Sequence, residues 1–154
     1  ERRRTRAPAR TWAAAAASLA AGLLVGVLIP RGESAMLSVG QDGLVAQGAL
    51  ASALETQLAA DEADAVRIGL SFRAQDGRYC RTFTLTDGGA AGLACRGAEG
   101  WDVPMTAASA GQGEVRMASA PAEILNAVDA MIAGEPLDAD GEAQARDRNW
   151  RAER

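Results

Sequence analysis

The sequence predicts an α+β protein in which a single N-terminal transmembrane helix precedes a small antiparallel sheet of 3–5 strands flanked by two helices. Three patterns lead to this fold class: an uncharged stretch near the N-terminus, alternating apolar residues in the middle of the chain, and apolar residues at helical spacing on both sides of that middle part. They divide the 154 residues into a basic flank (1–10), a span (11–30), a linker (31–42), an α+β domain (43–137) and a charged, disordered tail (138–154).

The uncharged stretch Thr11–Pro30 has the length that a helix needs to cross the core of a bilayer, roughly 30 Å at about 1.5 Å per residue. Basic residues beside a span stay in the cytoplasm, so the five arginines of the flank place the N-terminus inside and the C-terminal part outside. The alternative is a cleaved signal peptide. The stretch is longer than a usual signal core, however, and Pro30 and Arg31 stand where a cleavage site would follow. The chain starts with Glu1 rather than Met, so we expect a further segment upstream.

Small residues recur once per turn in the predicted span, at Ser18, Gly22 and Gly26. A GxxxG spacing lets two helices approach closely, which makes these residues a candidate dimer face and the homodimer a candidate state. The same spacing arises easily by chance in a span rich in alanine and glycine, and this alternative stays open.

The composition excludes several classes of function. Residues 31–154 contain 11 arginines and 19 acidic residues, a net charge of −8, which is a poor match to nucleic acid or anionic lipid. The chain has neither histidine nor lysine, so Ser-His-Asp and Cys-His catalysis, imidazole metal sites and Schiff bases are excluded. The acids occur singly at turns and helix ends, where turn chemistry explains them. We therefore expect no enzyme, no cofactor and no metal site.

The apolar pattern predicts the elements of the exterior part. A short strand at 35–39 lies in the linker, and leucines near helical spacing predict a helix over 43–60. Strict alternation predicts a strand at 66–73, and Asp-Gly turns then separate it from strands at 79–86 and 90–96.

Further elements follow toward the C-terminus. A short strand at 101–105 is expected at an edge because it contains Pro104, and a fifth strand is expected at 113–118. A helix within 119–137 begins at the cap Ser119 and stops at Gly134. Beyond it the chain is charged and has no apolar stripe, which predicts disorder.

The turn at Asp87-Gly88 places Cys80 directly opposite Cys95. Opposed Cα atoms in a hairpin lie about 4.5–5.5 Å apart, within the range of a disulfide. A four-residue loop (86–89) puts the pair at a non-hydrogen-bonded position, and we favour it over a two-residue loop because the side chains are then closer. Outside the cytoplasm such a pair is expected to be a structural disulfide. A redox-active pair is the alternative.

Centring the preceding hairpin on Asp76-Gly77 sets the register of its strands. It places residues of the two strands opposite each other in three pairs: Ile68 with Leu85, Leu70 with Phe83, and Phe72 with Arg81. One face of the sheet then carries the apolar side chains of the first strand together with Tyr79, Arg81, Phe83 and Leu85 of the second strand. Cys80 points to the opposite face.

The hairpins also bring aromatic residues and arginines together. Arg96 falls opposite Tyr79, where a cation–π contact is feasible. With Arg81 and Trp101 they form a candidate cluster that could bind an anion or another ligand. The alternative, which we favour, is that the arginine stems cover the aromatic edge of a small core.

Four parts of the sequence resemble one family. They are the pattern YCR…F…AGLACR…W (79–101), the segment GLVAQGALASALETQLA before it, the helix AEILNAVDAMIAGEPLD after it and the arginine-flanked span. From Arg10 to Leu137 the chain resembles the C-terminal part of membrane-anchored anti-sigma factors of the alphaproteobacterial type. In that family a cytoplasmic domain N-terminal to the span holds the sigma factor, and this sequence lacks that domain.

The resemblance implies a single-pass protein of the bacterial inner membrane, with a cytoplasmic N-terminus and a periplasmic sensory domain. Its partners would be the membrane and a sigma factor, and its role would be signalling to transcription. The resemblance supplies no ligand residues. The alternative function is a membrane-tethered periplasmic module that binds an envelope protein or ligand. A helical domain upstream would favour the first, and a short basic leader the second.

Overall fold

The computed structural model describes residues 35–41, 43–87, 89–108 and 120–152. All of them belong to one compact unit, residues 34–154. The predicted span, its flank, the dimer face of Ser18, Gly22 and Gly26, and the strand expected at 113–118 lie outside the described residues. Within the described residues, no helix has both the length and the apolar character needed to cross a membrane.

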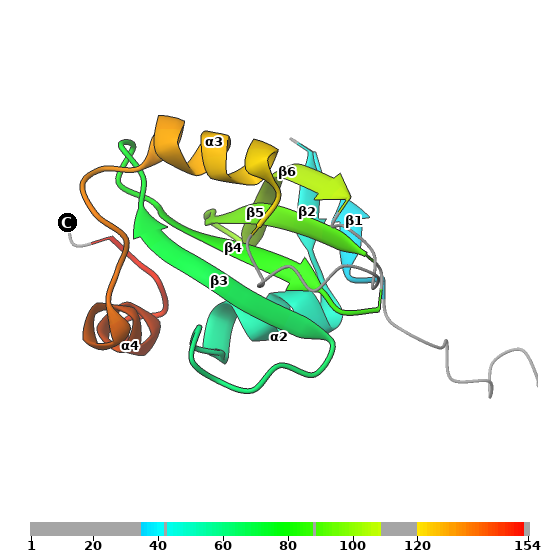
Figure 1. Ribbon diagram of the computed structural model, residues 1–154, viewed down its shortest axis with the longest axis horizontal. Helices are drawn as coiled ribbons and strands as arrows, with labels where there is room; N and C mark the ends of the chain where they lie inside the picture. The colour runs from blue at the N-terminus through cyan, green and yellow to red at the C-terminus, as the bar shows by residue number, and fades with distance from the viewer. Residues whose placement is uncertain (1–34, 42, 88, 109–119, 153–154) are drawn as a thin grey trace, which may run out of the picture. The chain divides into compact units, whose positions relative to one another are not determined.

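A six-stranded antiparallel sheet forms the centre of the domain (Figure 1). Four strands that follow one another in sequence lie side by side, and an N-terminal hairpin extends the sheet beyond the last of them. The spatial order is β1-β2-β6-β5-β4-β3. The strands are β1 (Leu37–Val39), β2 (Leu44–Ala46), β3 (Val66–Arg73), β4 (Tyr79–Leu85), β5 (Ala90–Arg96) and β6 (Trp101–Ala108).

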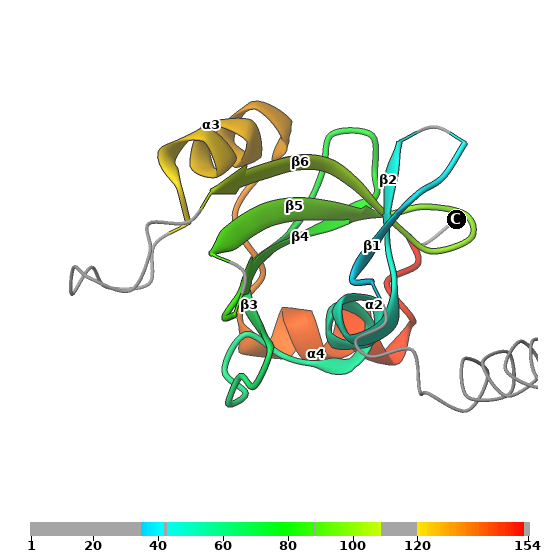
Figure 2. The same cartoon turned by 90° about the vertical axis from the view of Figure 1, so that its right-hand side faces the viewer.

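Helices cover both faces of this sheet (Figure 2). One face carries α2 (Gly48–Thr56) and α4 (Ala139–Asp147), and the other carries α3 (Ala122–Met131). Two buried apolar clusters result. The first contains Leu50, Leu54, Phe83, Trp101 and Trp150; the second contains Phe72, Cys80, Leu93, Cys95, Ile124 and Val128. The α+β class is confirmed, with six strands and three helices among the described residues in place of 3–5 strands and two helices.

The helix expected over 43–60 is shorter than predicted. Leu44–Ala46 form β2, which pairs with β1 on one side and with Asp102 and Val103 of β6 on the other. The helix α2 begins only at Gly48. Leu44 and Leu50 pack against the same core cluster, so their spacing suits a strand followed by a helix as well as one helix. Backbone pairing with β1 and β6 decides between the two.

The predicted register between β3 and β4 is wrong. Ile68 lies opposite Phe83 rather than Leu85, and Phe72 lies opposite Cys80 rather than Arg81. Two shifts of one residue produce the difference. The connection between β3 and β4 has five residues (74–78), which places Phe72 opposite Cys80. A β-bulge between Ile68 and Ser71 then inserts an extra residue into β3, which places Ile68 opposite Phe83 and reverses the faces. The bulge moves Phe72 to the α3 side and turns Ser71 toward Arg81.

The strand β6 is longer and more central than predicted. It extends over Trp101–Ala108 and lies between β2 and β5, although it contains Pro104. The short strand β2 pairs only with Asp102 and Val103, so the proline follows the part of β6 that has neighbours on both sides.

In the C-terminal part, the predicted helix is confirmed and the predicted disorder is wrong. Helix α3 lies within the expected range and begins after Pro121, while the expected cap Ser119 lies outside the described residues. The described part of the 138–154 tail is ordered, however. Helix α4 starts at its cap Asp138, whose carboxylate accepts from the backbone N–H of Gly141 at 2.8 Å. An apolar stripe is not what anchors α4, because the buried residues of this segment are Glu142, Ala145 and Trp150.

Candidate functional site

The disulfide between Cys80 and Cys95 is confirmed. The two residues are direct partners in β4 and β5, and their Cα atoms lie 4.0 Å apart, in keeping with a non-hydrogen-bonded pair. β4 ends at Leu85 and β5 begins at Ala90, which is the four-residue connection favoured above. Both cysteines are fully buried beneath α3 in the second core cluster. Burial keeps reductants away from the bridge in the folded domain and favours its structural role over the redox-active alternative.

Replacing both cysteines by alanine is expected to lower the free energy of unfolding by about 3 kcal/mol, because the bridge constrains the unfolded chain between residues 15 apart. Denaturant unfolding, followed by tryptophan fluorescence without reductant, measures the loss. Wild-type protein reduced while unfolded should show the same loss, and native wild-type protein should keep its disulfide in added reductant. A loss below about 1 kcal/mol would contradict the structural role.

Arg81 is the centre of a buried polar cluster between the sheet and helices α2 and α4. Its side chain is fully buried, and its guanidinium donates in three directions. Nε donates to Ser71 Oγ at 2.9 Å, Nη1 to the Leu54 carbonyl at 2.7 Å, and Nη2 to both the Gln57 carbonyl and Glu142 Oε1 at 2.7 Å. The two carbonyls lie at the C-terminal end of α2, where a helix leaves acceptors unpaired and favours a positive charge.

Glu142 neutralises this buried charge from helix α4. Its Oε1 also accepts from the Ser71 hydroxyl at 2.6 Å, while Oε2 accepts from the Ala59 backbone N–H at 2.9 Å. Burial lowers the pKa of Arg81, and the hydrogen bond and negative charge of Glu142 counter that effect. Because the usual pKa of arginine lies far above neutrality, Arg81 stays charged at pH 7. The cluster therefore joins α2, β3, β4 and α4 through one buried ion pair.

Trp150 closes the cluster from the chain after α4. The Arg81 guanidinium carbon lies 4.1 Å from the centroid of its ring, and the indole Nε1 donates to the Glu55 carbonyl at 2.9 Å. Tyr79 and Trp101 meet the ring edge-on, at centroid distances of 6.0 and 5.7 Å. The backbone of Asn149 and Trp150 is left-handed, with φ of 55° and 56°, which is rare for a residue as bulky as tryptophan.

Glu55 forms a second polar contact point at the border of this core. Its Oε2 accepts from Arg96 Nη1 and from Trp101 Nε1, both at 3.0 Å. Arg96 pairs with Trp101, and its guanidinium lies 5.8 Å from that ring rather than over Tyr79. The cation near the Tyr79 ring is instead Arg73, at 5.7 Å. The predicted Arg96–Tyr79 contact is thus replaced because β6 brings Trp101 beside Arg96.

The structure brings the predicted cluster of Tyr79, Arg81, Arg96 and Trp101 together on one face of the sheet. Tyr79, Arg81 and Trp101 are buried. Arg81 does not cover the aromatic edge with its stem, as expected, because its guanidinium lies inside the core against the Trp150 ring. Arg96 differs, because its half-buried side chain also lines a surface pocket. The cluster therefore divides into a closed core and one residue open to solvent.

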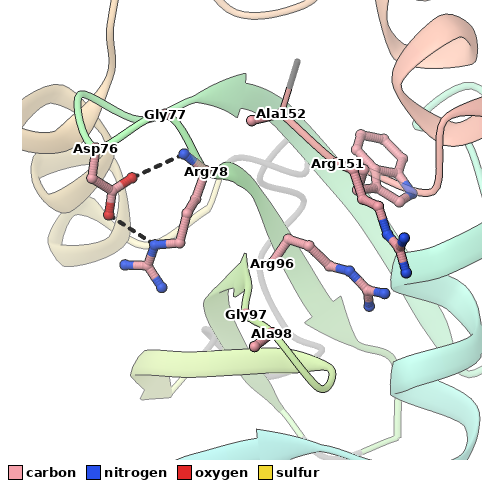
Figure 3. A pocket seen from close by; sticks show the side chains of 9 residues that line it. Asp76, Gly77, Arg78, Arg96, Gly97, Ala98, Arg151 and Ala152 are labelled. Atoms are coloured by element: carbon pink, nitrogen blue, oxygen red, sulfur yellow. Dashed lines mark hydrogen bonds and ion pairs between the residues drawn. The ribbon is translucent and has the colours of Figure 1, made fainter. Parts of the chain in front are cut away.

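The surface pocket has a volume of about 390 Å³ and is lined by three arginines, Arg78, Arg96 and Arg151 (Figure 3). They come from the β3–β4 turn, the end of β5 and the segment after α4. Asp76 orients Arg78: its carboxylate accepts from the backbone N–H at 3.0 Å and from Nε at 2.8 Å. These hydrogen bonds, backbone first, lower the pKa of Asp76.

A larger hollow of about 940 Å³ adjoins this pocket along the β1–β2 hairpin and the β5–β6 turn. The two share Arg78 and Ala98 in their linings. Its other lining residues come from the hairpin and the turn, and Glu99 and Asp102 give it an acidic border. Positive side chains are concentrated in the smaller pocket.

Several residues of the site were missed from the sequence. Glu142 and Ser71 carry no local signal, because their partner Arg81 is 61 and 10 residues away. Trp150 does carry a local signal, because a lone tryptophan in a charged segment is a candidate anchor. Arg151 follows it directly in the sequence.

Chemistry based on a metal has no support in the part of the chain that the structure describes, where no group of three His, Cys, Asp or Glu side chains could hold an ion. Comparisons with protein-family models, with curated proteins and with solved structures found no match.

Proposed function

We propose that this chain is the membrane anchor and periplasmic sensory domain of a transmembrane anti-sigma factor in the bacterial inner membrane. The fully buried Cys80–Cys95 disulfide carries the placement of the domain outside the cytoplasm, and the resemblance of the sequence carries the anti-sigma role. Structural disulfides persist in oxidising compartments, so the bridge favours a domain outside the cytoplasm. The arginine-rich flank before Thr11–Pro30 favours the same orientation.

The proposed mechanism separates sensing from binding of the sigma factor. A cytoplasmic domain N-terminal to Glu1 would hold the sigma factor at the membrane, and the exterior domain would report an envelope condition through the span. Release would follow from proteolysis or from a change in dimer packing. The face of Ser18, Gly22 and Gly26 would serve the second route.

The test is a pull-down of the full-length gene product from detergent-solubilised membranes, followed by mass spectrometry. We expect a sigma factor to be recovered. The matched control is the same product without the region before Glu1, which should lose the sigma factor and keep its place in the membrane. Recovery of envelope proteins alone, with or without that region, would overturn the anti-sigma proposal.

A second candidate is a membrane-tethered periplasmic binding module, which the arginine-lined pocket favours. In this case the span is a simple tether and the exterior domain holds an envelope component. The same pull-down separates the two functions, because only the anti-sigma factor retains a cytoplasmic partner.

A further inference from the structure

We propose that the pocket of Arg78, Arg96 and Arg151 binds a small ligand that carries two or more oxyanionic groups, either phosphate or carboxylate. The proposal goes beyond the anti-sigma function, because it concerns a binding site of the exterior domain that needs neither a sigma factor nor a membrane. It rests on the charge and the availability of the three guanidinium groups and on the fixed placement of two of them.

The charge of the pocket is opposite to that of the surrounding chain. Its lining contains three arginines and one acid, Asp76, whereas residues 31–154 carry a net charge of −8. Three segments far apart in sequence bring the arginines to one lining, where the Arg96 and Arg151 side chains extend toward the same side and the Arg78 side chain points away from them (Figure 3). A guanidinium donates two parallel hydrogen bonds to a carboxylate or phosphate, which makes a group of arginines a fitting site for a ligand with several such groups.

The guanidinium groups are available to a ligand. No described residue forms an ion pair with Arg151, whose side chain is exposed. Arg78 uses Nε for Asp76 and Nη1 for Asp102, the latter at 3.5 Å, and these contacts are open to solvent. Arg96 uses Nη1 for Glu55. The two exposed ion pairs of Arg78 are weak, so a multiply charged ligand can share or replace them.

Two of the three arginines, Arg78 and Arg96, are also held in place before any ligand arrives. Asp76 fixes Arg78 from both its backbone and its side chain, and Glu55 fixes Arg96 beside Trp101. Arg151 directly follows the left-handed backbone of Asn149 and of the buried Trp150. Strained backbone of this kind clusters at ligand sites, and placement before binding reduces the entropy lost on binding.

The size of the pocket limits the ligand. About 390 Å³ lies at the lower end of small-molecule sites, roughly 300–1,000 Å³. The remaining lining includes Gly77, Gly97 and Ala98, whose lack of bulk leaves the arginines accessible (Figure 3). The site suits a small polyanion rather than a folded partner.

The test is isothermal titration calorimetry of the complete 154-residue chain in a nonionic detergent at about 0.15 M salt, which screens non-specific attraction. The probes are pyrophosphate, citrate and inorganic phosphate. We expect one or both of the first two to bind with one site per chain, and inorganic phosphate to bind more weakly because it has a single anionic group. The tighter probe identifies whether phosphate or carboxylate is the natural group.

Three variants make the test specific. Arg151→Ala should weaken binding about tenfold or more, because a charge-assisted pair of hydrogen bonds is lost. Ala98→Glu adds a carboxylate to the lining without removing an arginine and should abolish binding. Arg67→Ala removes an exposed arginine of β3 outside the pocket and should change the affinity less than twofold.

Absence of heat from both multiply charged probes at millimolar concentration would overturn the proposal. Equal losses in Arg151→Ala and Arg67→Ala would also overturn it, because they would show that only the overall charge attracts the anions. Circular dichroism of each variant confirms that the fold is intact. Neither outcome depends on whether a sigma factor is recovered in the pull-down.

Discussion

Replacing Glu142 by glutamine is expected to lower the free energy of unfolding by about 3 kcal/mol or more. The change removes the carboxylate that forms the ion pair with the fully buried Arg81. It also turns an amide nitrogen toward one of the donors that face Glu142, because Oε1 and Oε2 both accept hydrogen bonds. Removing one member of a buried pair costs more than the pair contributes, since the other charge then stays buried alone.

Urea unfolding, followed by tryptophan fluorescence and far-ultraviolet circular dichroism, measures this loss. The control is Glu135→Gln, which removes the same charge at an exposed position in the turn after α3. We expect that variant to lie within about 0.5 kcal/mol of the wild type. Equal stabilities of Glu142→Gln and Glu135→Gln would contradict the buried ion pair.

Replacing Trp150 by alanine is expected to lower the free energy of unfolding by about 3–5 kcal/mol. The indole is almost fully buried, lies over the Arg81 guanidinium and contacts Tyr79 and Trp101. Its removal opens a cavity beside a buried charge, so packing and cation–π energy are lost together.

Two further variants separate these contributions. Trp150→Phe keeps an aromatic ring but loses the hydrogen bond to the Glu55 carbonyl, and we expect a loss of about 1–2 kcal/mol. Gln144→Ala, at an exposed position of α4, is the control and should leave the stability nearly unchanged. Limited proteolysis of Trp150→Ala should cut first within α4. If that segment resists cleavage as in the wild type, Trp150 is not its anchor.

The hairpin of β4 and β5 could be predicted from the sequence because its determinants are local. The Asp87-Gly88 turn and the alternation of the flanking residues set one register, and that register places Cys80 opposite Cys95, as the structure has it. The hairpin before it has equally clear signals. Its bulge at Ile68–Ser71, however, is tied to distant partners, since Ser71 bonds to Glu142 and Arg81.

Helix α4 could not be predicted for the same reason, because the contacts that hold it come from distant parts of the chain. Apolar periodicity finds helices that bury a stripe, and α4 is held instead by a carboxylate, a small residue and the tryptophan that follows it. The sequence placed Arg81 and Arg96 on the correct strands. It could not assign their separate roles, because Glu142, Trp150 and Arg151 reach the site from the segment predicted to be disordered.

The separation between Arg81 and Glu142 has a consequence for biosynthesis. The carboxylate that neutralises Arg81 is added 61 residues later, and the indole that covers it is added later still. Until the chain has been made as far as Trp150, closing the sheet over α2 would bury an unpaired cation, at a cost of several kcal/mol. The strands therefore stay partly open until that segment is present, and the domain folds after Trp150 has been added rather than strand by strand.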